Sequence, residues 1–135
     1  AENNLVYDYQ IRNGQFFDTE RLSCELDNKP SIDPTSKVAV LLSRYTISSG
    51  ELLAVAFKGR PNTRFIGEPT AGYTTGNGFS QVTADLFMVI SQAVYIDRDK
   101  NVYKAKVGVD EEMEFQHQIE LDGDKQVKRA TDWLN

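Results

Sequence analysis

Two adjacent serines, Ser48 and Ser49, stand between an apolar segment and a helix-like segment, and Gly50 and Glu51 follow them. A hydroxyl at the first turn of a helix lies beside unpaired backbone N–H groups and the positive end of the helix dipole, which favour an anion. When a serine attacks a carbonyl, the substrate oxygen becomes an oxyanion, and the N–H that follows the nucleophile can receive it. Each such donor contributes about 3 kcal/mol in measured enzymes. These residues could therefore support acyl transfer to serine.

The same residues also suit a structural role. Thr46, Ser48 or Ser49 at the N-cap, followed by Glu51 near the third helical position, describes a capping box that needs no catalysis. Spacing alone favours capping over catalysis. It also leaves open which of the two serines would be the nucleophile.

The elements that position the serines form a strand–helix–strand pattern. The continuous apolar run Lys37–Ser43 predicts a central strand that is buried on both faces. A helix is expected over Ser49–Lys58, and Gly59 and Pro61 end it. Its apolar face is expected to consist of Leu52, Leu53, Val55, Ala56 and Phe57. The next short strand is TRFIG, residues 63–67, so the segment predicts a right-handed βαβ unit of an α/β fold.

The glycine- and threonine-rich segment that follows, residues 68–78, is predicted to be a surface loop that buries little. Loops after parallel strands gather at one edge of the sheet, so this loop should face the Thr46–Gly50 turn. We expect the Ser48 hydroxyl to point toward it. Glu51 is expected to accept hydrogen bonds from its own turn or from the Thr70 loop, because a carboxylate one turn along the helix is badly placed to take the Ser48 proton.

The rest of the chain predicts mainly strands. The expected elements are a β-hairpin around Asn13-Gly14, two or three strands within 79–96 and 102–109 with a turn at Asp97–Asn101, and a closing helix over 124–135. Trp133 and Leu134 are expected to pin the closing helix to the body of the protein.

The composition of the chain indicates a globular domain and argues against several classes of protein. With 135 residues, 40% of them apolar and 26% charged, the chain suits a single globular domain. The net charge of −5 and the scattered Lys and Arg residues argue against a nucleic-acid partner. One cysteine excludes an internal disulfide. There is no apolar run of the roughly 20 residues that span a membrane and no signal peptide at the start, so any membrane anchor or export signal would lie outside this chain.

No metal or cofactor is expected. The segment Asp97–Asn101 begins like a calcium loop, but Val102 stands where the loop needs glycine and Gly108 where it needs glutamate. The GNGFSQ segment, residues 76–81, lacks the third glycine of a dinucleotide fingerprint and precedes a strand.

The histidine and the acidic cluster near the end of the chain are predicted to be solvated and not catalytic. His117 is the only histidine, and the alternation around it predicts a solvated strand position in place of a catalytic base. The acidic cluster of Glu111, Glu112 and Glu114 is predicted to be a solvated face.

Two segments carry a resemblance to a known family. TISSGE, residues 46–51, and FIGEPTAGYTTGN, residues 65–77, resemble the nucleophile region of the tail-specific or C-terminal processing serine peptidases, and are most similar to the branch that contains the nisin-resistance protein. VGVDEE, residues 107–112, and RATDWL, residues 129–134, extend the resemblance from about Val38 to the end. It implies part of a crotonase- or ClpP-like α/β peptidase core.

The resemblance implies roles for individual residues. The family's nucleophile falls on Ser48, with the Ser49 N–H as an oxyanion donor and Ser49 as the fallback nucleophile. Residues implied in substrate binding or in the structure of the site are Thr46, Gly50, Glu51, Glu68, Thr70, Gly72 and Tyr73. Members with a serine–lysine dyad carry lysine at the position of Tyr73, and tricorn-like members carry a glutamate near Ala105 and Lys106, so a serine–histidine dyad remains.

In that dyad the histidine precedes the serine, as does a Gly-Gly loop that lends the second oxyanion donor, and this chain has neither before Ser48. The resemblance thus implies the C-terminal part of an extracytoplasmic peptidase acting on peptides or proteins, inactive without its upstream part. The Val38–Leu42 strand should then expose apolar surface or pair with another copy. The alternative is a non-catalytic peptide- or ligand-binding module on the same fold. The sequence upstream of Ala1 would discriminate between the two.

Overall fold

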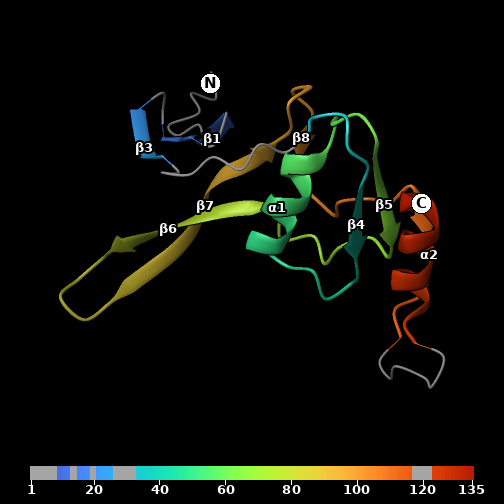
Figure 1. Ribbon diagram of the computed structural model, residues 1–135. Helices are drawn as coiled ribbons and strands as arrows, with labels where there is room; N and C mark the ends of the chain where they lie inside the picture. Colours follow the sequence, from blue (N-terminus) through green and yellow to red (C-terminus); the bar gives the residue numbers. More distant parts are fainter. Residues whose placement is uncertain (1–8, 13–14, 19–20, 26–32, 117–122) are drawn as a thin grey trace. The chain divides into compact units, whose positions relative to one another are not determined.

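The computed structural model describes residues 9–12, 15–18, 21–25, 33–116 and 123–135 (Figure 1). The chain divides into two compact units. One comprises residues 1–34 and 76–93, and the other comprises residues 35–75 and 94–135. Neither α1 nor α2, the helices of the described chain, has the length and hydropathy of a membrane-crossing helix.

The first unit contains a small antiparallel sheet in the order β1-β2-β3. Its strands are β1 (Tyr9–Arg12), β2 (Gln15–Asp18) and β3 (Arg21–Glu25). Arg12 pairs with Gln15, which confirms the predicted hairpin, although Asn13-Gly14 itself lies outside the described residues. Strand β2 ends at Asp18, and β3 pairs with it as a third strand, with a register shift between Phe16 and Phe17.

Most of a second hairpin also belongs to this unit. It is formed by β6 (Thr75–Gln81) and β7 (Phe87–Ile96), joined through a hydrogen bond of 2.8 Å from Val82 N to Leu86 O. The alternating pattern thus predicted strands correctly, but the loop that was expected to reach residue 78 ends at Thr74.

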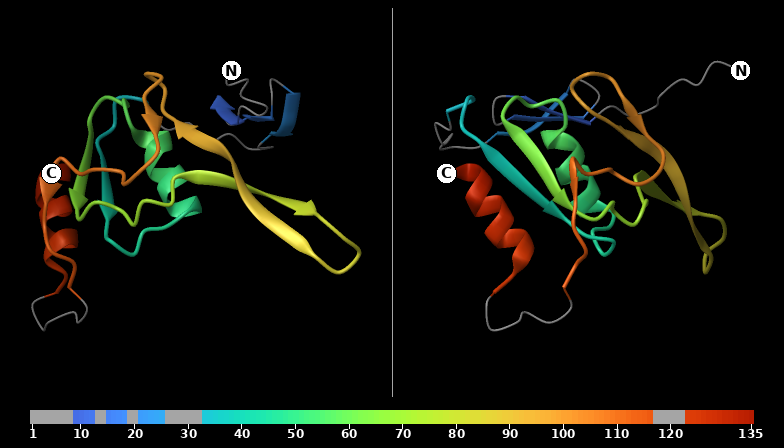
Figure 2. Two further views of the ribbon diagram at one scale, coloured as in Figure 1. Left: turned by 180° about the vertical axis from the view of Figure 1, so that it is seen from behind. Right: turned by 90° about the vertical axis from the view of Figure 1, so that its right-hand side faces the viewer.

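The βαβ unit is the centre of the second unit, and its prediction is confirmed. Strand β4 (Val38–Leu42) leads through helix α1 (Ser49–Phe57) to β5 (Thr63–Gly67), and β4 and β5 pair in parallel. Strand β9 (Glu111–Glu112) pairs in parallel with the other side of β5. Helix α1 lies on one face of this sheet, and α2 (Lys125–Leu134) lies on the opposite face (Figure 2).

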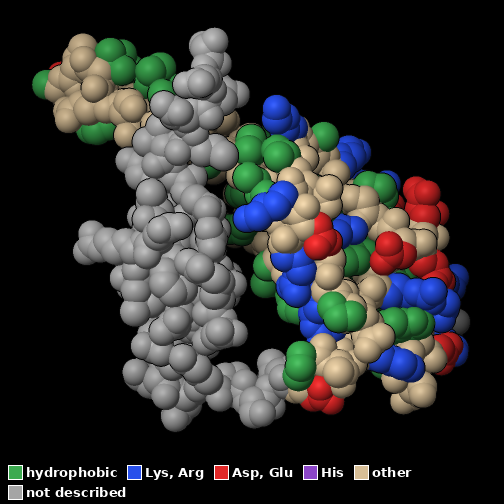
Figure 3. Space-filling view, turned by 90° about the horizontal axis from the view of Figure 1, so that it is seen from above, with side chains coloured by type: hydrophobic (Ala, Val, Ile, Leu, Met, Phe, Trp, Pro, Cys, Tyr) green, Lys and Arg blue, Asp and Glu red, His purple; other side chains and the backbone are tan. Residues whose placement is uncertain are grey.

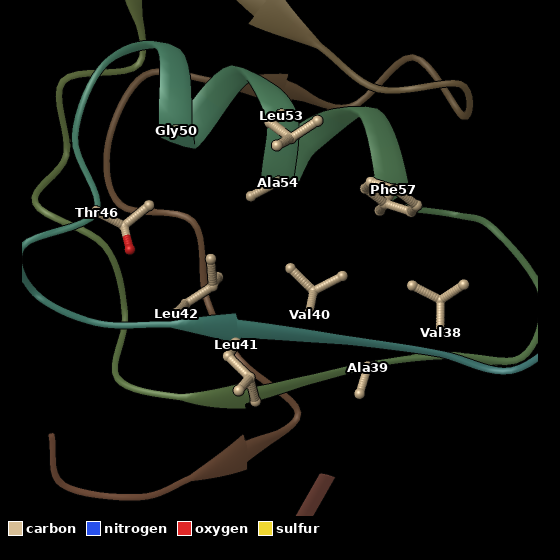
Figure 4. A pocket seen from close by; sticks show the side chains of 10 residues that line it. All are labelled: Val38, Ala39, Val40, Leu41, Leu42, Thr46, Gly50, Leu53, Ala54 and Phe57. Carbon is tan, nitrogen blue, oxygen red and sulfur yellow. The ribbon is translucent and has the colours of Figure 1, made fainter. Parts of the chain in front are cut away.

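The sheet order β4-β5-β9 places β4 at an edge among the described strands. The expectation of a central strand buried on both faces is therefore wrong, and Leu41 is 38% exposed. Val38, Val40 and Leu42 point toward α1, where an apolar groove of about 340 Å³ opens between strand and helix (Figure 4). Ala39 and Leu41 point to the other face. This geometry agrees with the expected exposed apolar strand.

A compact apolar cluster fixes α1 on the sheet. Its buried members are Leu42, Ala54, Val55, Phe65 and Val107. The helix buries the face of Ala54 and Val55. The expectation that Leu52, Leu53 and Ala56 face the core is wrong, because all three are exposed, Leu52 to 42% and Leu53 to 62%. Gly67 has a φ of 125°, and a Cβ there would lie 2.0 Å from the Leu42 carbonyl oxygen, so the close approach of β5 to β4 requires glycine.

The predicted turn at Asp97–Asn101 is confirmed. The Asp97 carboxylate accepts hydrogen bonds from the backbone N–H groups of Asp99 and Asn101 and, at 2.9 Å, from the Tyr103 hydroxyl. Strand β8 (Val102–Tyr103) then pairs with the end of β7. The turn thereby joins the end of β7 to β8 within the second unit.

The closing helix α2 is confirmed, with two corrections around it. Trp133 contacts the cations of Lys37 and Arg64, each 5.6 Å from its ring centroid, but Leu134 is 43% exposed and does not pin the helix. Glu111 is not simply solvated, because Arg129 donates to both of its carboxylate oxygens, one at 2.8 Å. This pair joins α2 to β9.

Candidate active site

Ser48 is the N-cap residue of α1 and has an unusual backbone conformation. Its φ is 52° and its ψ is −114°, although it is not a glycine. A residue with a Cβ adopts such a positive φ only at a cost of about 1–3 kcal/mol, and such residues cluster at functional sites. The sharp turn between β4 and α1 leaves the Ser48 side chain exposed.

Glu51 holds this strained turn. Its side chain is completely buried and accepts hydrogen bonds from Ser48 N at 2.9 Å, Gly72 N at 2.7 Å and Thr70 Oγ1 at 2.5 Å. The predicted hydrogen bonds of Glu51 to its own turn and to the Thr70 loop are confirmed. One carboxylate therefore joins the first turn of α1 to the loop after β5.

That loop is more buried than the sequence suggested. Thr70 and Thr74 are both fully buried, so the expectation of a loop that buries little is wrong at these positions. Thr70 Oγ1 accepts from Val107 N at 2.8 Å, and Thr74 Oγ1 donates to Ala105 O at 2.9 Å. The threonines are buried because their hydroxyls satisfy backbone groups of the 105–107 segment.

Further contacts draw the loop and the serine turn together. Ala71 N donates to Thr46 O at 3.0 Å, which places the two segments side by side as predicted. Gly72 has a φ of 102°, and a Cβ there would lie 3.3 Å from Lys106 Cγ. A side chain at position 72 would therefore strain the backbone that donates to Glu51.

Two further candidate residues, Glu68 and Tyr73, belong to the loop after β5. Glu68 accepts from Arg44 N at 3.1 Å and faces the Arg44 guanidinium at 3.5 Å. Tyr73 is 63% exposed. On the face seen in Figure 3, basic and acidic side chains are interspersed.

Ser49 is the first residue of α1 and is exposed. The next two backbone N–H groups have partners, since Gly50 N donates to Ile47 O and Glu51 N to Ser48 O. In the part of the chain that the structure describes, Ser49 N has no hydrogen-bond partner. An unpaired N–H directly after Ser48, at a helix N-terminus, has the chemistry of an oxyanion donor.

Tyr95 lies beside the loop, and the sequence did not indicate this position: its backbone N–H donates to Thr74 O at 3.3 Å, and its side chain is partly buried against the apolar cluster. Burial raises the pKa of Tyr95, the Ser48 side chain lowers it in part, and the nearby Glu51 charge raises it. The alternating pattern predicted a strand here, but no local motif distinguishes Tyr95 from the other tyrosines.

The described residues contain no cluster of three or more His, Cys, Asp or Glu side chains that could hold a metal ion. His117, predicted to be solvated, lies outside the described residues.

Comparisons with known proteins agree with this geometry. Residues 6–115 match the model of peptidase family S41. The nisin-resistance protein of Lactococcus lactis subsp. lactis is 42% identical over 67 residues, which are 50% of this chain and 21% of that protein. The chain thus spans about a fifth of the length of this curated relative.

Solved structures are similar in fold. A lipoprotein from Streptococcus agalactiae matches with a TM-score of 0.58 and 24% identity over 73% of this chain and 31% of that chain. The photosystem II D1 C-terminal processing protease matches with a TM-score of 0.54 and 23% identity over 72% and 26% of the two chains. The predicted α/β peptidase-core fold is confirmed.

Proposed function

Because the chain belongs to peptidase family S41, we propose that it carries the nucleophile of a serine peptidase and that this nucleophile is Ser48. The observation that carries the proposal is the strained backbone of Ser48 at the head of α1. Strain of this kind persists only where the surroundings hold it, and here a buried carboxylate does so. A nucleophile on a sharp strand-to-helix turn is exposed to substrate and lies beside helix N–H groups.

The proposed reaction is acyl transfer followed by hydrolysis. Ser48 Oγ attacks the peptide carbonyl carbon while a base takes the hydroxyl proton, and the Ser49 N–H receives the developing oxyanion. The base then gives that proton to the leaving amine, and water hydrolyses the acyl-serine ester. We place the base and the second oxyanion donor in a segment outside this chain, because Tyr73 replaces the family's lysine and no histidine precedes Ser48.

The chain would then be the C-terminal portion of a longer catalytic domain. Its small share of the length of its relatives supports this proposal. We further propose a peptide or protein substrate and a location outside the cytoplasm or at the cell envelope. The similarity to a protein named for nisin resistance supports both, and any membrane anchor would belong to a segment outside this chain.

The test compares Ser48→Ala with Ser49→Ala in the full-length protein, using one fluorogenic peptide. Ser48→Ala should lower turnover by a factor of about 10³ or more, because a nucleophile, its base and the oxyanion donors act as one set. Ser49→Ala keeps the backbone N–H and should retain turnover within about tenfold. The 135-residue chain alone should show none. Turnover by this chain that survives Ser48→Ala would refute both the nucleophile and the missing base.

The second candidate is a non-catalytic module that binds peptides or other ligands. The observation in its favour is tyrosine at position 73 together with the lack of a histidine before Ser48. A full-length protein that binds the labelled peptide with the same Kd before and after Ser48→Ala, and hydrolyses it in neither case, would establish this function instead.

A further inference from the structure

The hairpin of β6 and β7 (Figure 1) exposes large apolar side chains along most of its length. Every residue from Gln81 to Gln92 is exposed, and Phe79 is 80% exposed. The large apolar side chains on this surface are Phe79, Val82, Leu86, Phe87, Met88, Val89 and Ile90. A contiguous apolar patch of this kind marks an interaction site.

Both faces of the hairpin are apolar. The Ser91 hydroxyl donates to Asn77 Oδ1 at 3.0 Å, so these two side chains share one face. Successive side chains of a strand point to opposite faces, which assigns the others. The face of Asn77 and Ser91 also carries Phe79, Phe87 and Val89, and the opposite face carries Met88 and Ile90. Strands with one solvated face alternate apolar and polar residues, whereas a continuous apolar run is typical of a strand covered on both faces.

Neither lipid nor a second copy of this chain fits this surface. The tip of the hairpin is polar, and Asp85 at the tip is the only charged residue between Gly76 and Ala93. A membrane would have to take up this carboxylate first, which is costly. In a twofold pair of copies, each copy covers the same face of its partner. The opposite apolar face would then stay open.

We propose that the hairpin is the docking surface for the part of the same polypeptide that precedes Ala1, and that this part packs apolar side chains on both faces. The inference rests on the proposed function, in which this chain is the C-terminal portion of a longer catalytic domain. The matches cover 21% of the nisin-resistance protein and 31% of the lipoprotein structure. A domain of that length has enough further polypeptide to cover two faces of one hairpin.

The two methionines of the chain report on docking without any substitution. Met88 is 46% exposed on the hairpin, and Met113, after β9, is partly buried and serves as the reference. Hydrogen peroxide should oxidise Met88 at least about tenfold more slowly in the full-length protein than in the 135-residue chain, because oxidation follows exposure. Mass spectrometry measures both rates, and the Met113 rate should change by less than about twofold.

Three results of this footprint would overturn the proposal. The first is an equal Met88 rate in the two proteins. The second is equal slowing of Met88 and Met113, which would not be specific to the hairpin. The third is slow oxidation of Met88 in a dimer of the 135-residue chain, because a second copy would then cover this face.

Substitutions test each face separately. Val89→Thr and Ile90→Thr keep a β-branched side chain and place a hydroxyl on opposite faces. Val102→Thr in β8 is the matched control, because Val102 is a strand residue of similar exposure, 49% against 54% for Val89. In the 135-residue chain, all three variants should melt within about 2 °C of wild type, since exposed positions tolerate the change.

In the full-length protein, Val89→Thr and Ile90→Thr should each lower the melting temperature by about 3–6 °C, because a covered hydroxyl lacks a partner. Val102→Thr should not. A loss confined to one face, or an equal loss in Val102→Thr, would overturn the proposal.

Turnover of the fluorogenic peptide separates this inference from the proposed function. Slow Met88 oxidation in a full-length protein that keeps full turnover after Ser48→Ala would support docking and overturn the nucleophile. Fast Met88 oxidation together with turnover that Ser48→Ala abolishes would overturn docking alone.

Discussion

The two helices of the second unit begin in opposite ways. Helix α2 begins at Asp124, whose φ of −74° and ψ of 118° are ordinary and whose carboxylate accepts from Gln126 N and Val127 N. Helix α1 begins at Ser48 with a φ of 52°, and the carboxylate that holds it comes from Glu51 inside the helix. An N-cap that serves only stability needs no strain, so the difference supports the proposal that the start of α1 carries the nucleophile.

The energies explain how the strained turn persists. A conformation like that of Ser48 costs about 1–3 kcal/mol. Each hydrogen bond to a charged group contributes about 1.5–3 kcal/mol net, and buried Glu51 accepts three of them. The carboxylate can therefore offset the strain and still lock the Thr70 loop. Helix α2 has no such cost to offset.

The largest effect on stability is expected for Glu51→Gln. The three groups facing this carboxylate are all donors, and an amide offers one acceptor oxygen and one further donor. The free energy of unfolding should fall by about 3 kcal/mol, as measured by urea denaturation, because buried donors lose their acceptor. Glu112→Gln, at an exposed position in β9, is the control and should stay within about 0.5 kcal/mol of wild type.

In the full-length protein, Glu51→Gln should lower the free energy of unfolding but leave the turnover per folded molecule close to that of wild type. The reason is that Glu51 takes no proton in the proposed reaction. Loss of turnover in Glu51→Gln with an unchanged melting temperature would contradict this and would assign the carboxylate a direct catalytic role.

The βαβ unit and the turn at Asp97–Asn101 could be predicted because their sequence signals are local. These signals act within a few positions of the chain: the apolar run before Ser48, the glycine and proline after Lys58, and the turn residues themselves. The hydrogen bonds of Glu51 were also predictable, since the carboxyl ends of parallel strands bring their loops together.

What escaped prediction depends on contacts between distant segments. Thr70 is polar, and its burial follows from a hydrogen bond with Val107, 37 residues further along the chain. Tyr95 looks like any residue of an alternating strand, and only the fold brings it to Thr74, whose carbonyl oxygen accepts from its backbone N–H. The run at Val38–Leu42 was interpreted as a central strand because composition indicates hydrophobicity, but not which neighbours a strand has.

A smaller loss of stability is expected at the other helix start. Asp124→Ala removes the acceptor of two N–H groups at the head of α2 and should lower the free energy of unfolding by about 1 kcal/mol. Turnover of the full-length protein should not change. Asp132→Ala is the control, because the ion pair of Asp132 with Lys128 is exposed and contributes roughly 0.5 kcal/mol or less. A loss of turnover in Asp124→Ala would show that α2 also serves the site and would remove the contrast between the helices.

The smallest and most specific effect is expected for Ser48→Gly, which should stabilise the protein while abolishing turnover. Glycine adopts a positive φ without steric cost, so the substitution relieves the strain, although the freer unfolded chain takes back part of the gain. The net increase in the free energy of unfolding should be about 0.5–1 kcal/mol.

Ser48→Ala keeps the Cβ that causes the strain and should be near wild type in stability, and Asp124→Gly, at an ordinary φ, should lose a few tenths of a kcal/mol. Parallel urea denaturation of these three variants and wild type measures the order. A Ser48→Gly variant no more stable than Ser48→Ala would mean that the turn is unstrained in solution. The strongest structural reason for choosing Ser48 over Ser49 as the nucleophile would then be lost.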